Sequence, residues 1–540
     1  MRGATKGAIA VGVFLAMAGG AGYGMYAMVG DAGEGGPAAA TAAEVGSGPP
    51  TAAEVLTTAR AFLAAWAAGD ARAAADLSND PEATQYAVAD YRTKAHITRA
   101  VITPGTPRGA LVPFTVRAEV SYGGHGKPLA YASSLTVVRG LTSKKPLVDW
   151  QPAVLHPQLR KDEKLRTGTP DAPPVRITDR NGKELTAGAY PSLRRILDEL
   201  RARYAPRAGG TGGTELWIEP ARADAPKRTL LTVDPGRPGS VRTVLDAGLQ
   251  AAAERAALRY QDASVVALRP STGDVLAVAN HRADGFDAAM LGTTPSGSTL
   301  KIVTAAMLLD RGLVTADGPA ECPATVSWYG KSFRNQGGFS LSGSSFGTAF
   351  ARSCNTAFIK KIKAVDDDAA LAREAREVFG LGLEWRTGVA SFDGDVPEAA
   401  GAEAAAEYIG QGRVRMNPLT VASVIATAKT GVFRQPVLVP ADWDHRPVAT
   451  AERAMKPEVA AQLRQLLRQT AVSGTAAGAM AGVPGPKGAK TGSAEVDGRV
   501  NPDSWFTGYS GDLAAAAYVA GGGHGGEAAG PLVATVLRAG

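Results

Sequence analysis

The stretch PSGSTLK, residues 295–301, brings a hydroxyl nucleophile and an amine together at a short spacing. Ser298 and Lys301 stand three residues apart, so on a helix both side chains leave the same face. The run that follows is apolar and reaches Gly312, where a helix stop is expected. Taken alone the pattern is weak, because a serine there is also a common helix cap beside a solvated lysine. Its meaning depends on the rest of the chain.

The stretch RSCNTAF supplies a second pair of polar side chains. A serine active site needs a base, a route for the proton and donors for the oxyanion. Ser353 and Asn355 lie two residues apart before a predicted helix, so a hydroxyl and an amide are placed to face one cleft. The competing interpretation is an ordinary turn capped by its own side chains.

The tripeptide Lys-Thr-Gly occurs twice, at residues 429–431 and 490–492. The first copy ends an alanine-rich helix, where a glycine stop is expected. The second leads into a β-rich run, and a strand that a substrate backbone approaches needs a small residue such as Gly492. We interpret the first copy as structural and the second as functional.

In this order, Ser-x-x-Lys, Ser-x-Asn and Lys-Thr-Gly resemble the motifs of the penicillin-recognising serine enzymes. Four flanking stretches agree: TVLDAGLQ, ALRPSTGDVLAVAN, IGQGRVRMNPLTVAS and WFTGY. Residues 239–540 therefore resemble the transpeptidase domain of a class B penicillin-binding protein, an antiparallel sheet flanked by helices. The usual Pro-Gly-Ser-Thr-Phe-Lys is altered by Ser296 and Leu300, which leaves the roles intact and bears on β-lactam access.

The resemblance implies a role for each reacting group. Ser298 is the acylated nucleophile, Lys301 its general base and Ser353 the proton relay. Asn355 binds the amide of the substrate or of a β-lactam, and Lys490 contributes positive charge. Because Lys301 has to be neutral to accept a proton, we expect burial and the nearby Lys490 to lower its pKa.

The resemblance also implies how substrate is held. Thr491 contacts the substrate carboxylate, and Gly492 and Ser493 continue the same strand. The backbone N–H groups of Ser298 and Ser493 form the oxyanion hole. No cofactor is implied, because every group that the reaction needs is a side chain or a backbone amide.

The N-terminus carries an uncharged segment, residues 7–30, after two positive charges. It exceeds the roughly 20 residues that cross a bilayer as a helix, and the leading charges favour an inside N-terminus. A cleaved signal peptide is the alternative, with ATA at residues 40–42 as its small-residue site. On length we favour an uncleaved anchor, residues 1–30, before a flexible linker, residues 31–49. We expect a single-pass protein of the cell membrane with most of the chain outside the cytoplasm.

Residues 50–158 begin with a helical apolar pattern that breaks at Gly69-Asp70 and continue with four β-rich runs, ending in PLVDWQPAVL. Helices followed by antiparallel strands predict an α+β domain. Through FLAAWAAGD and VDWQPAVLHPQL it resembles the NTF2-like N-terminal domain of penicillin-binding proteins of the methicillin-resistance type. Residues 159–238 mix charge, proline and glycine and indicate a short connecting region. The whole chain is thus predicted to be a multidomain α+β protein.

The composition bears on which partners and metals the protein could bind. The net charge is +7, but the basic residues are scattered without a stripe or block, which argues against nucleic acid as a partner. The histidines are isolated from one another, so no zinc spacing appears. Cys322 and Cys354 are the two cysteines, and an oxidising compartment permits a disulfide whose pairing the sequence leaves open.

The favoured function is peptidoglycan D,D-transpeptidation through a Ser298 acyl-enzyme, with D-Ala-D-Ala stem peptides as substrates and β-lactams as covalent inhibitors. A D,D-carboxypeptidase shares all three motifs and stays open as an alternative, whereas the anchored multidomain layout argues against a β-lactamase. A non-catalytic β-lactam sensor or wall scaffold would be free to lose Ser298 or Lys301, and both are present. Residues 50–158 are of the wrong class for a glycosyltransferase, so a separate glycosyltransferase or wall-synthesis complex is the expected partner.

Overall fold

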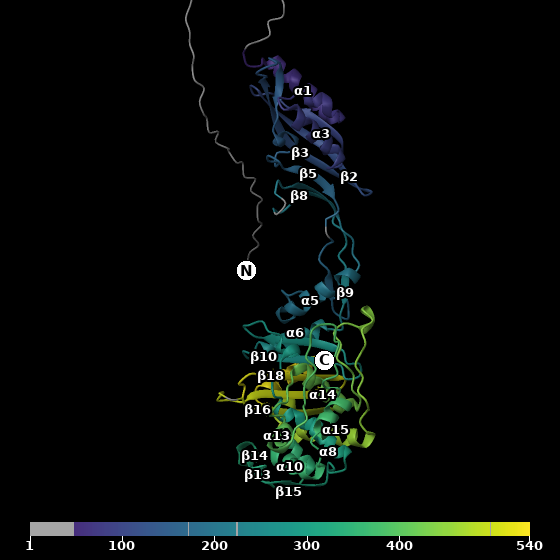
Figure 1. The fold of residues 1–540 in the computed structure, drawn as a ribbon, viewed down its shortest axis with the longest axis vertical. Helices are drawn as coiled ribbons and strands as arrows, with labels where there is room; N and C mark the ends of the chain where they lie inside the picture. The colour runs from purple at the N-terminus through teal and green to yellow at the C-terminus, as the bar shows by residue number, and fades with distance from the viewer. Residues whose placement is uncertain (1–47, 171, 223–224, 497) are drawn as a thin grey trace, which may run out of the picture.

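The computed structural model describes residues 48–170, 172–222, 225–496 and 498–540. Figure 1 shows two units along the long axis, an N-terminal unit above and a C-terminal unit below, joined by extended segments. The predicted anchor and nearly all of the predicted linker lie outside the described residues. Within those described ranges, no helix has the length and apolar character needed to cross a bilayer.

Three helices open the N-terminal unit: α1 (Ala52–Ala68), α2 (Ala71–Ala75) and α3 (Pro81–Thr93). α1 begins at a capping box, in which Glu54 N–H donates to Thr51 Oγ1 and Thr51 N–H donates to the Glu54 carboxylate. It ends at Gly69 in the left-handed conformation, φ 75°, where the sequence predicted the break. The Trp66 ring packs edge-on against Phe114 of the sheet, with centroids 5.8 Å apart. The helix is thereby fixed at both ends and on its buried face.

The sheet of this unit is antiparallel, in the order β1-β2-β3-β4. Its strands are β1 (Ile97–Pro104), β2 (Leu111–Tyr122), β3 (His125–Arg139) and β4 (Pro146–Asp149). The fourth predicted run, PLVDWQPAVL, is only partly a strand, because its second half forms the short helix α4 (Pro152–Leu155). Pro152 has no N–H to donate to a ladder, and its fixed φ suits the first turn of a helix.

Residues 159–238, predicted as one connecting region, contribute to both hydrophobic cores. A second sheet, β5-β7-β8, places Leu165, Leu216 and Ile218 in the core of the N-terminal helices. Its strands are β5 (Lys164–Gly168), β7 (Thr214–Glu219) and β8 (Arg228–Asp234). The C-terminal core instead takes α5 (Arg194–Tyr204) and β6 (Arg176–Thr178). β6 pairs parallel with β9 (Ser240–Arg242), which lies just beyond this region. The chain therefore crosses between the units repeatedly here, through the extended segments in Figure 1.

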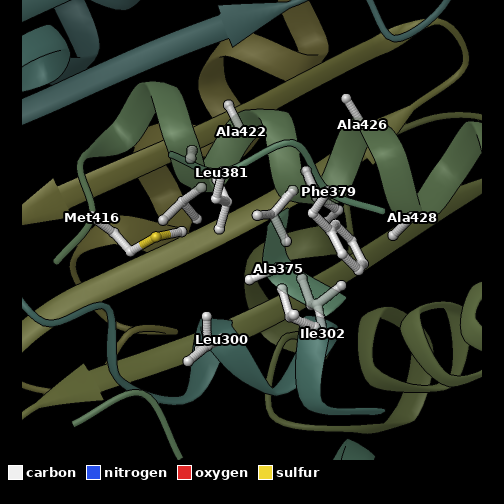
Figure 2. Close-up of a cluster of buried hydrophobic side chains, with 14 of the residues drawn as sticks. Leu300, Ile302, Ala375, Phe379, Leu381, Met416, Ala422, Ala426 and Ala428 are labelled. Atoms are coloured by element: carbon white, nitrogen blue, oxygen red, sulfur yellow. The ribbon is translucent and has the colours of Figure 1, made fainter. Parts of the chain in front are cut away.

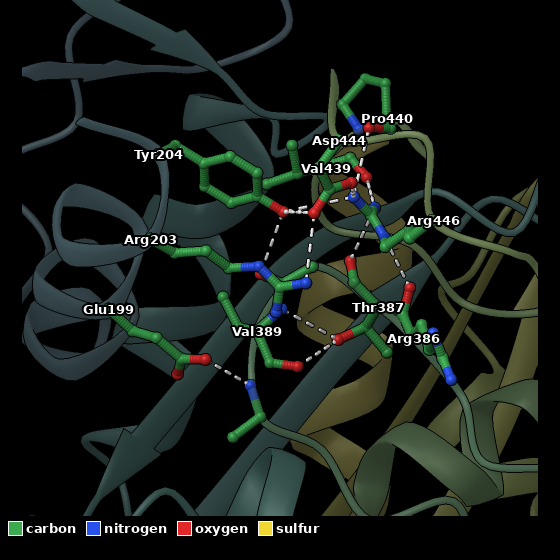
Figure 3. A network of polar contacts seen from close by, with 12 residues as sticks. Glu199, Arg203, Tyr204, Arg386, Thr387, Val389, Val439, Pro440, Asp444 and Arg446 are labelled. Carbon is green, nitrogen blue, oxygen red and sulfur yellow. Dashed lines mark hydrogen bonds and ion pairs between the residues drawn. The ribbon is translucent and has the colours of Figure 1, made fainter. Parts of the chain in front are cut away.

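A buried polar network joins α5 to the loops of the C-terminal unit (Figure 3). The Asp444 carboxylate accepts from Arg446 Nη1 at 2.7 Å, from Tyr204 Oη at 3.1 Å and from Arg203 Nη2 at 3.1 Å. Arg446 also donates to the carbonyl oxygen of Arg386 at 2.7 Å. Because both charges of the central pair are buried and fully hydrogen-bonded, this joint fixes how α5 sits on the C-terminal unit.

The C-terminal unit is built on a five-stranded antiparallel sheet in the order β11-β10-β18-β17-β16. The strands are β10 (Ala263–Leu268), β11 (Val275–His281), β16 (Lys487–Ala494), β17 (Asp503–Ser510) and β18 (Leu513–Val519). The predicted hairpin through RPSTGD is confirmed, since β10 and β11 pair antiparallel. Side chains alternate along β10: Val265 lies in the core with α6 (Ala247–Ala257) and α17 (Ala529–Ala539), and Val266 lies in the opposite core. Helices therefore cover both faces of the sheet.

That opposite core contains the central helix of the unit. Figure 2 shows Ile302 of α8 (Lys301–Asp310) packed with Phe379, Leu381 and Met416 beneath α14 (Pro418–Thr430). The surrounding helices are α7 (Ala288–Leu291), α9 (Phe346–Ala351), α10 (Asn355–Ile359), α11 (Ile362–Val365), α12 (Ala370–Glu377), α13 (Gly401–Glu407) and α15 (Pro457–Ser473). The short helix α16 (Ala477–Met480) lies on the other face of the sheet, with Met480 in the core of α6 and α17. Two small antiparallel pairs complete the lobe: β12 (Pro319–Cys322) with β15 (Leu341–Ser345), and β13 (Thr325–Trp328) with β14 (Lys331–Arg334).

The separate cores predict separate unfolding transitions. Phe62→Ala removes a fully buried ring from the N-terminal core and should destabilise that unit by about 3–5 kcal/mol. The matched variant Phe379→Ala removes a ring from the C-terminal core. In differential scanning calorimetry, Phe62→Ala should lower the melting temperature of the N-terminal unit alone. Phe379→Ala should lower that of the C-terminal unit alone. A single transition lowered by both variants would contradict the division.

Candidate active site

The predicted nucleophile and base lie where a 3-10 turn, η3 (Gly297–Leu300), runs into α8. Residues three apart in a 3-10 turn are eclipsed, so the side chains of Ser298 and Lys301 start from stacked positions. Lys301 is 0% exposed, whereas Ser298 is half-exposed. The turn thus carries a partly exposed serine three residues before a buried lysine.

Ser353 occupies the residue that ends α9 in a Schellman motif. Its N–H donates to the carbonyl oxygen of Phe350 at 2.9 Å, and the Cys354 N–H donates to that of Ala349 at 2.8 Å. Ser353 has a φ of 59°, in the left-handed region where such motifs usually have glycine. A serine at this position costs free energy that glycine would not, so its side chain needs another reason to be present.

The Ser353 hydroxyl contacts the second Lys-Thr-Gly copy, which lies within β16. Lys490 is 0% exposed, and its Nζ donates to Ser353 Oγ at 2.9 Å and to the carbonyl oxygen of Thr491 at 2.9 Å. The first copy ends α14, with Gly431 as its cap at φ 80°, as the alanine-rich pattern predicted. Only the second copy therefore reaches the other predicted residues.

The three motifs meet in one hydrogen-bonded network. Lys301 Nζ donates to Asn355 Oδ1 at 2.6 Å, to the carbonyl oxygen of Ser353 at 2.8 Å and to Ser353 Oγ at 3.4 Å. Ser353 Oγ therefore lies between the amines of Lys301 and Lys490. The contacts of Lys301 Nζ among the described residues do not include Ser298 Oγ. Within the same ranges, no three His, Cys, Asp or Glu side chains lie close enough to hold a metal ion.

Burial lowers the pKa of both lysines. It lowers the pKa of Lys301 well below its usual value, and the neighbouring Lys490 lowers that pKa further. Burial also lowers the pKa of Lys490 to about 7. The sites that hold these amines thus favour their neutral forms far below the pH at which an exposed lysine deprotonates.

Glycines bring the nucleophile turn against the edge of β16. Gly297 has a φ of 53°, and a Cβ there would lie 2.4 Å from the carbonyl oxygen of Ser493. A Cβ on Gly492 would lie 2.8 Å from the carbonyl oxygen of Ser296 and 2.9 Å from Cβ of Trp505. Packing against the nucleophile turn is thus one reason for the small size of Gly492, and the approach of a substrate to this residue stays a prediction. Close packing here sets the backbone amides of Ser298 and Ser493 on neighbouring segments.

The two cysteines form a disulfide, with Cα atoms 6.3 Å apart. Cys322 ends β12, and Cys354 lies between Ser353 and Asn355. The crosslink, whose pairing the sequence left open, attaches the Ser353–Asn355 turn to a neighbouring strand.

Comparison with known proteins identifies the family of this chain. The sequence profile of the penicillin binding protein transpeptidase domain matches residues 263–538. The chain belongs to the penicillin-binding protein transpeptidase family.

A curated relative is the peptidoglycan D,D-transpeptidase PbpA of Mycolicibacterium smegmatis, 31% identical over 325 residues. That alignment covers 51% of this chain and 65% of the relative, so the chain spans less than two thirds of its length.

Two solved structures share the fold. One, from a study of a peptidoglycan synthase complex, is 23% identical with a TM-score of 0.55 and covers 70% of this chain and 92% of its own. The other is an imipenem acyl-enzyme complex of penicillin-binding protein A from M. tuberculosis, 24% identical with a TM-score of 0.50, covering 69% of this chain and 95% of its own. At these identities the likeness establishes the fold alone.

The site of this family member includes a residue that the sequence did not reveal. Thr475 is exposed, and its Oγ1 lies 2.7 Å from Thr491 Oγ1, so two hydroxyl groups share one hydrogen bond at the site. The Thr475 N–H donates to the carbonyl oxygen of Ala351 at 3.0 Å, which holds it beside the end of α9. No spacing or periodic pattern marks Thr475, because the contact joins segments brought together only by the fold.

The strained turn gives a prediction for this penicillin-binding protein. Ser353→Gly and Ser353→Ala both remove the hydroxyl, but only glycine is relaxed at φ 59°. The glycine variant should be more stable than the alanine variant by about 1–2 kcal/mol in denaturant unfolding. Equal stabilities would show that the backbone at Ser353 is not strained.

Proposed function

We propose that this chain is a peptidoglycan D,D-transpeptidase that β-lactams acylate at Ser298. The observation that carries the proposal is the pair of buried amines, Lys301 and Lys490, that converge on Ser353 Oγ, with the partly exposed Ser298 on the turn that leads into Lys301. The named activity of the curated relative supports the same reaction.

Acylation uses the neutral form of Lys301. Ser298 Oγ attacks the carbonyl carbon of the penultimate D-Ala, and its proton passes to Lys301 Nζ. The N–H groups of Ser298 and Ser493 stabilise the oxyanion. The C–N bond then breaks, and a proton reaches the leaving amine of the terminal D-Ala through Ser353 Oγ, which lies between the two amines. The result is an ester on Ser298 and free D-Ala.

Transfer reverses these steps with a new amine. The amine of a second stem peptide attacks the ester carbonyl, loses its proton to the same network and forms the crosslink, which restores the Ser298 hydroxyl. Before acylation, Asn355 holds the amide of the donor and Thr491 holds its terminal carboxylate, which leaves with D-Ala. Asn355 Oδ1 is already fixed by Lys301, and Thr491 Oγ1 by Thr475, so both binding groups are ordered before substrate arrives.

The finer assignments extend this proposal to the rest of the chain. Residues 1–30 anchor it in the cell membrane, residues 31–49 are a linker and the bulk is extracytoplasmic. Residues 50–158 form an NTF2-like domain of the methicillin-resistance type, and residues 239–540 carry the transpeptidase. Residues 159–238 connect the two and contribute to the cores of both. The partner is a glycosyltransferase of a wall-synthesis complex, a proposal supported by the synthase complex whose structure shares the fold.

Intact-protein mass spectrometry with benzylpenicillin tests the central step. A long-lived adduct should form on the wild-type chain and be absent from Ser298→Ala. With a D-Ala-D-Ala thioester and a D-amino acid acceptor, the amide product should exceed the hydrolysis product. Hydrolysis alone would make the protein a carboxypeptidase, and an adduct that persists in Ser298→Ala would refute the assignment of the nucleophile.

The lowered pKa of Lys301 sets the pH dependence of acylation. Because the neutral amine is the base, the acylation rate should rise with pH through the pKa of Lys301. Lys490→Met removes the neighbouring cation that lowers this pKa, so the acidic limb of the profile should move to higher pH. Lys487→Met is the matched control, since Lys487 Nζ on the same strand donates to carbonyl oxygens of Met480 and Val483 instead. An unmoved limb in Lys490→Met would show that the two amines are not coupled.

A further inference from the structure

One buried amide, Asn335, holds the Ser353–Asn355 turn from behind. Asn335 follows β14, belongs to none of the three motifs and is 0% exposed. Its Oδ1 accepts from the Asn355 N–H at 2.8 Å and from the Thr356 N–H at 3.1 Å. These are two of the first N–H groups of α10, which have no partner inside the helix.

The other end of the same amide is attached to two further segments. Asn335 Nδ2 donates to the carbonyl oxygen of Pro323 at 2.9 Å and to that of Phe339 at 2.8 Å. Oδ1 and Nδ2 are therefore both used to capacity, and the side chain is fixed in one orientation. It links the start of α10 to the segment after β12 and to the loop that follows β14.

Asn335 fixes the position of Asn355, the residue whose Oδ1 contacts the proposed base Lys301. The Asn355 backbone is held by Asn335, and Asn355 Nδ2 donates to the carbonyl oxygen of the adjacent Arg334 at 2.9 Å. Asn355 Oδ1 then faces Lys301 Nζ at 2.6 Å. The disulfide acts on Cys354, one residue earlier, so it leaves the Asn355 and Thr356 N–H groups to Asn335.

We propose that Asn335 is a positioning residue for acylation: it sets Asn355 Oδ1 against Lys301 and closes the turn around the buried amine. This inference rests on the proposed transpeptidase function. Asn335 touches neither substrate nor the reacting atoms, and it acts through Asn355. Because displacements of about 1 Å remote from the chemistry cost about 100-fold in rate, the turn needs such a fixed support.

The test is the second-order rate constant for acylation by benzylpenicillin, measured on folded protein at 25 °C. Asn335→Ala should lower it about 100-fold. The matched control is Gln250→Ala, which removes another fully buried amide that pairs with the backbone of Val278 on the far side of the sheet. The control should melt earlier, like Asn335→Ala, yet acylate within about threefold of the wild type.

A pH profile separates positioning from mere stability. A loosened turn admits water to Lys301, relieves the burial that lowers its pKa and moves the acidic limb of acylation to higher pH. The limb should not move in Gln250→Ala. Asn335→Asp keeps the side-chain volume but loses the Nδ2 donors to Pro323 and Phe339. It should therefore lower the acylation rate constant and move the acidic limb to higher pH, as the alanine variant does. This variant provides the test if Asn335→Ala does not fold.

Acylation of folded Asn335 variants at the rate and with the pH profile of the Gln250 control would overturn the inference. Failure of the wild-type chain itself to form an adduct would instead refute the proposed function, so the two failures are distinguishable.

Discussion

The structure of the catalytic unit depends on burying two lysine amines beside one serine hydroxyl. Removing one ammonium group from water is unfavourable, and burying two close together is more so, unless at least one loses its proton. Lys301 and Lys490 also lie near aromatic rings, with Nζ 5.5 Å from the Phe358 centroid and 5.6 Å from that of Phe350. The fold thus uses the free energy of burial to make a base from a residue that water would keep protonated.

The remaining architecture holds this arrangement in place. Helices on both faces bury the central sheet, so that β16 is a rigid support for Lys490. The glycines of the nucleophile turn let that turn pack directly on the strand, and the Schellman motif at Ser353 turns a hydroxyl inward at a position where glycine is usual. The strained backbone at Ser353 is tolerated because three other segments hold this turn: β16 through Lys490, β12 through the disulfide, and the segment after β14 through Asn335.

Part of the fold and of the candidate site could be predicted from the sequence, and part depends on contacts between distant segments. The family resemblance, carried by the three motifs, predicted that Lys301, Ser353 and Lys490 share one site, and the structure brings them together. The role of Gly431 as a helix stop was predicted from its local sequence. The second half of PLVDWQPAVL was wrongly assigned to a strand, although Pro152 marks the helix start. The support from Asn335 and Thr475 could not be predicted, because it consists of single hydrogen bonds between distant segments. The division of residues 159–238 between two cores is likewise a property of the fold.

The most direct test of this account measures the charge of Lys301 itself. Labelling lysine at the ε carbon, with the Lys301 signal assigned by its loss in Lys301→Arg, gives the titration by NMR. The account predicts a neutral amine well below the pH at which exposed lysines titrate, with the midpoint rising in Lys490→Met. A Lys301 signal that titrates together with the exposed lysines would contradict it.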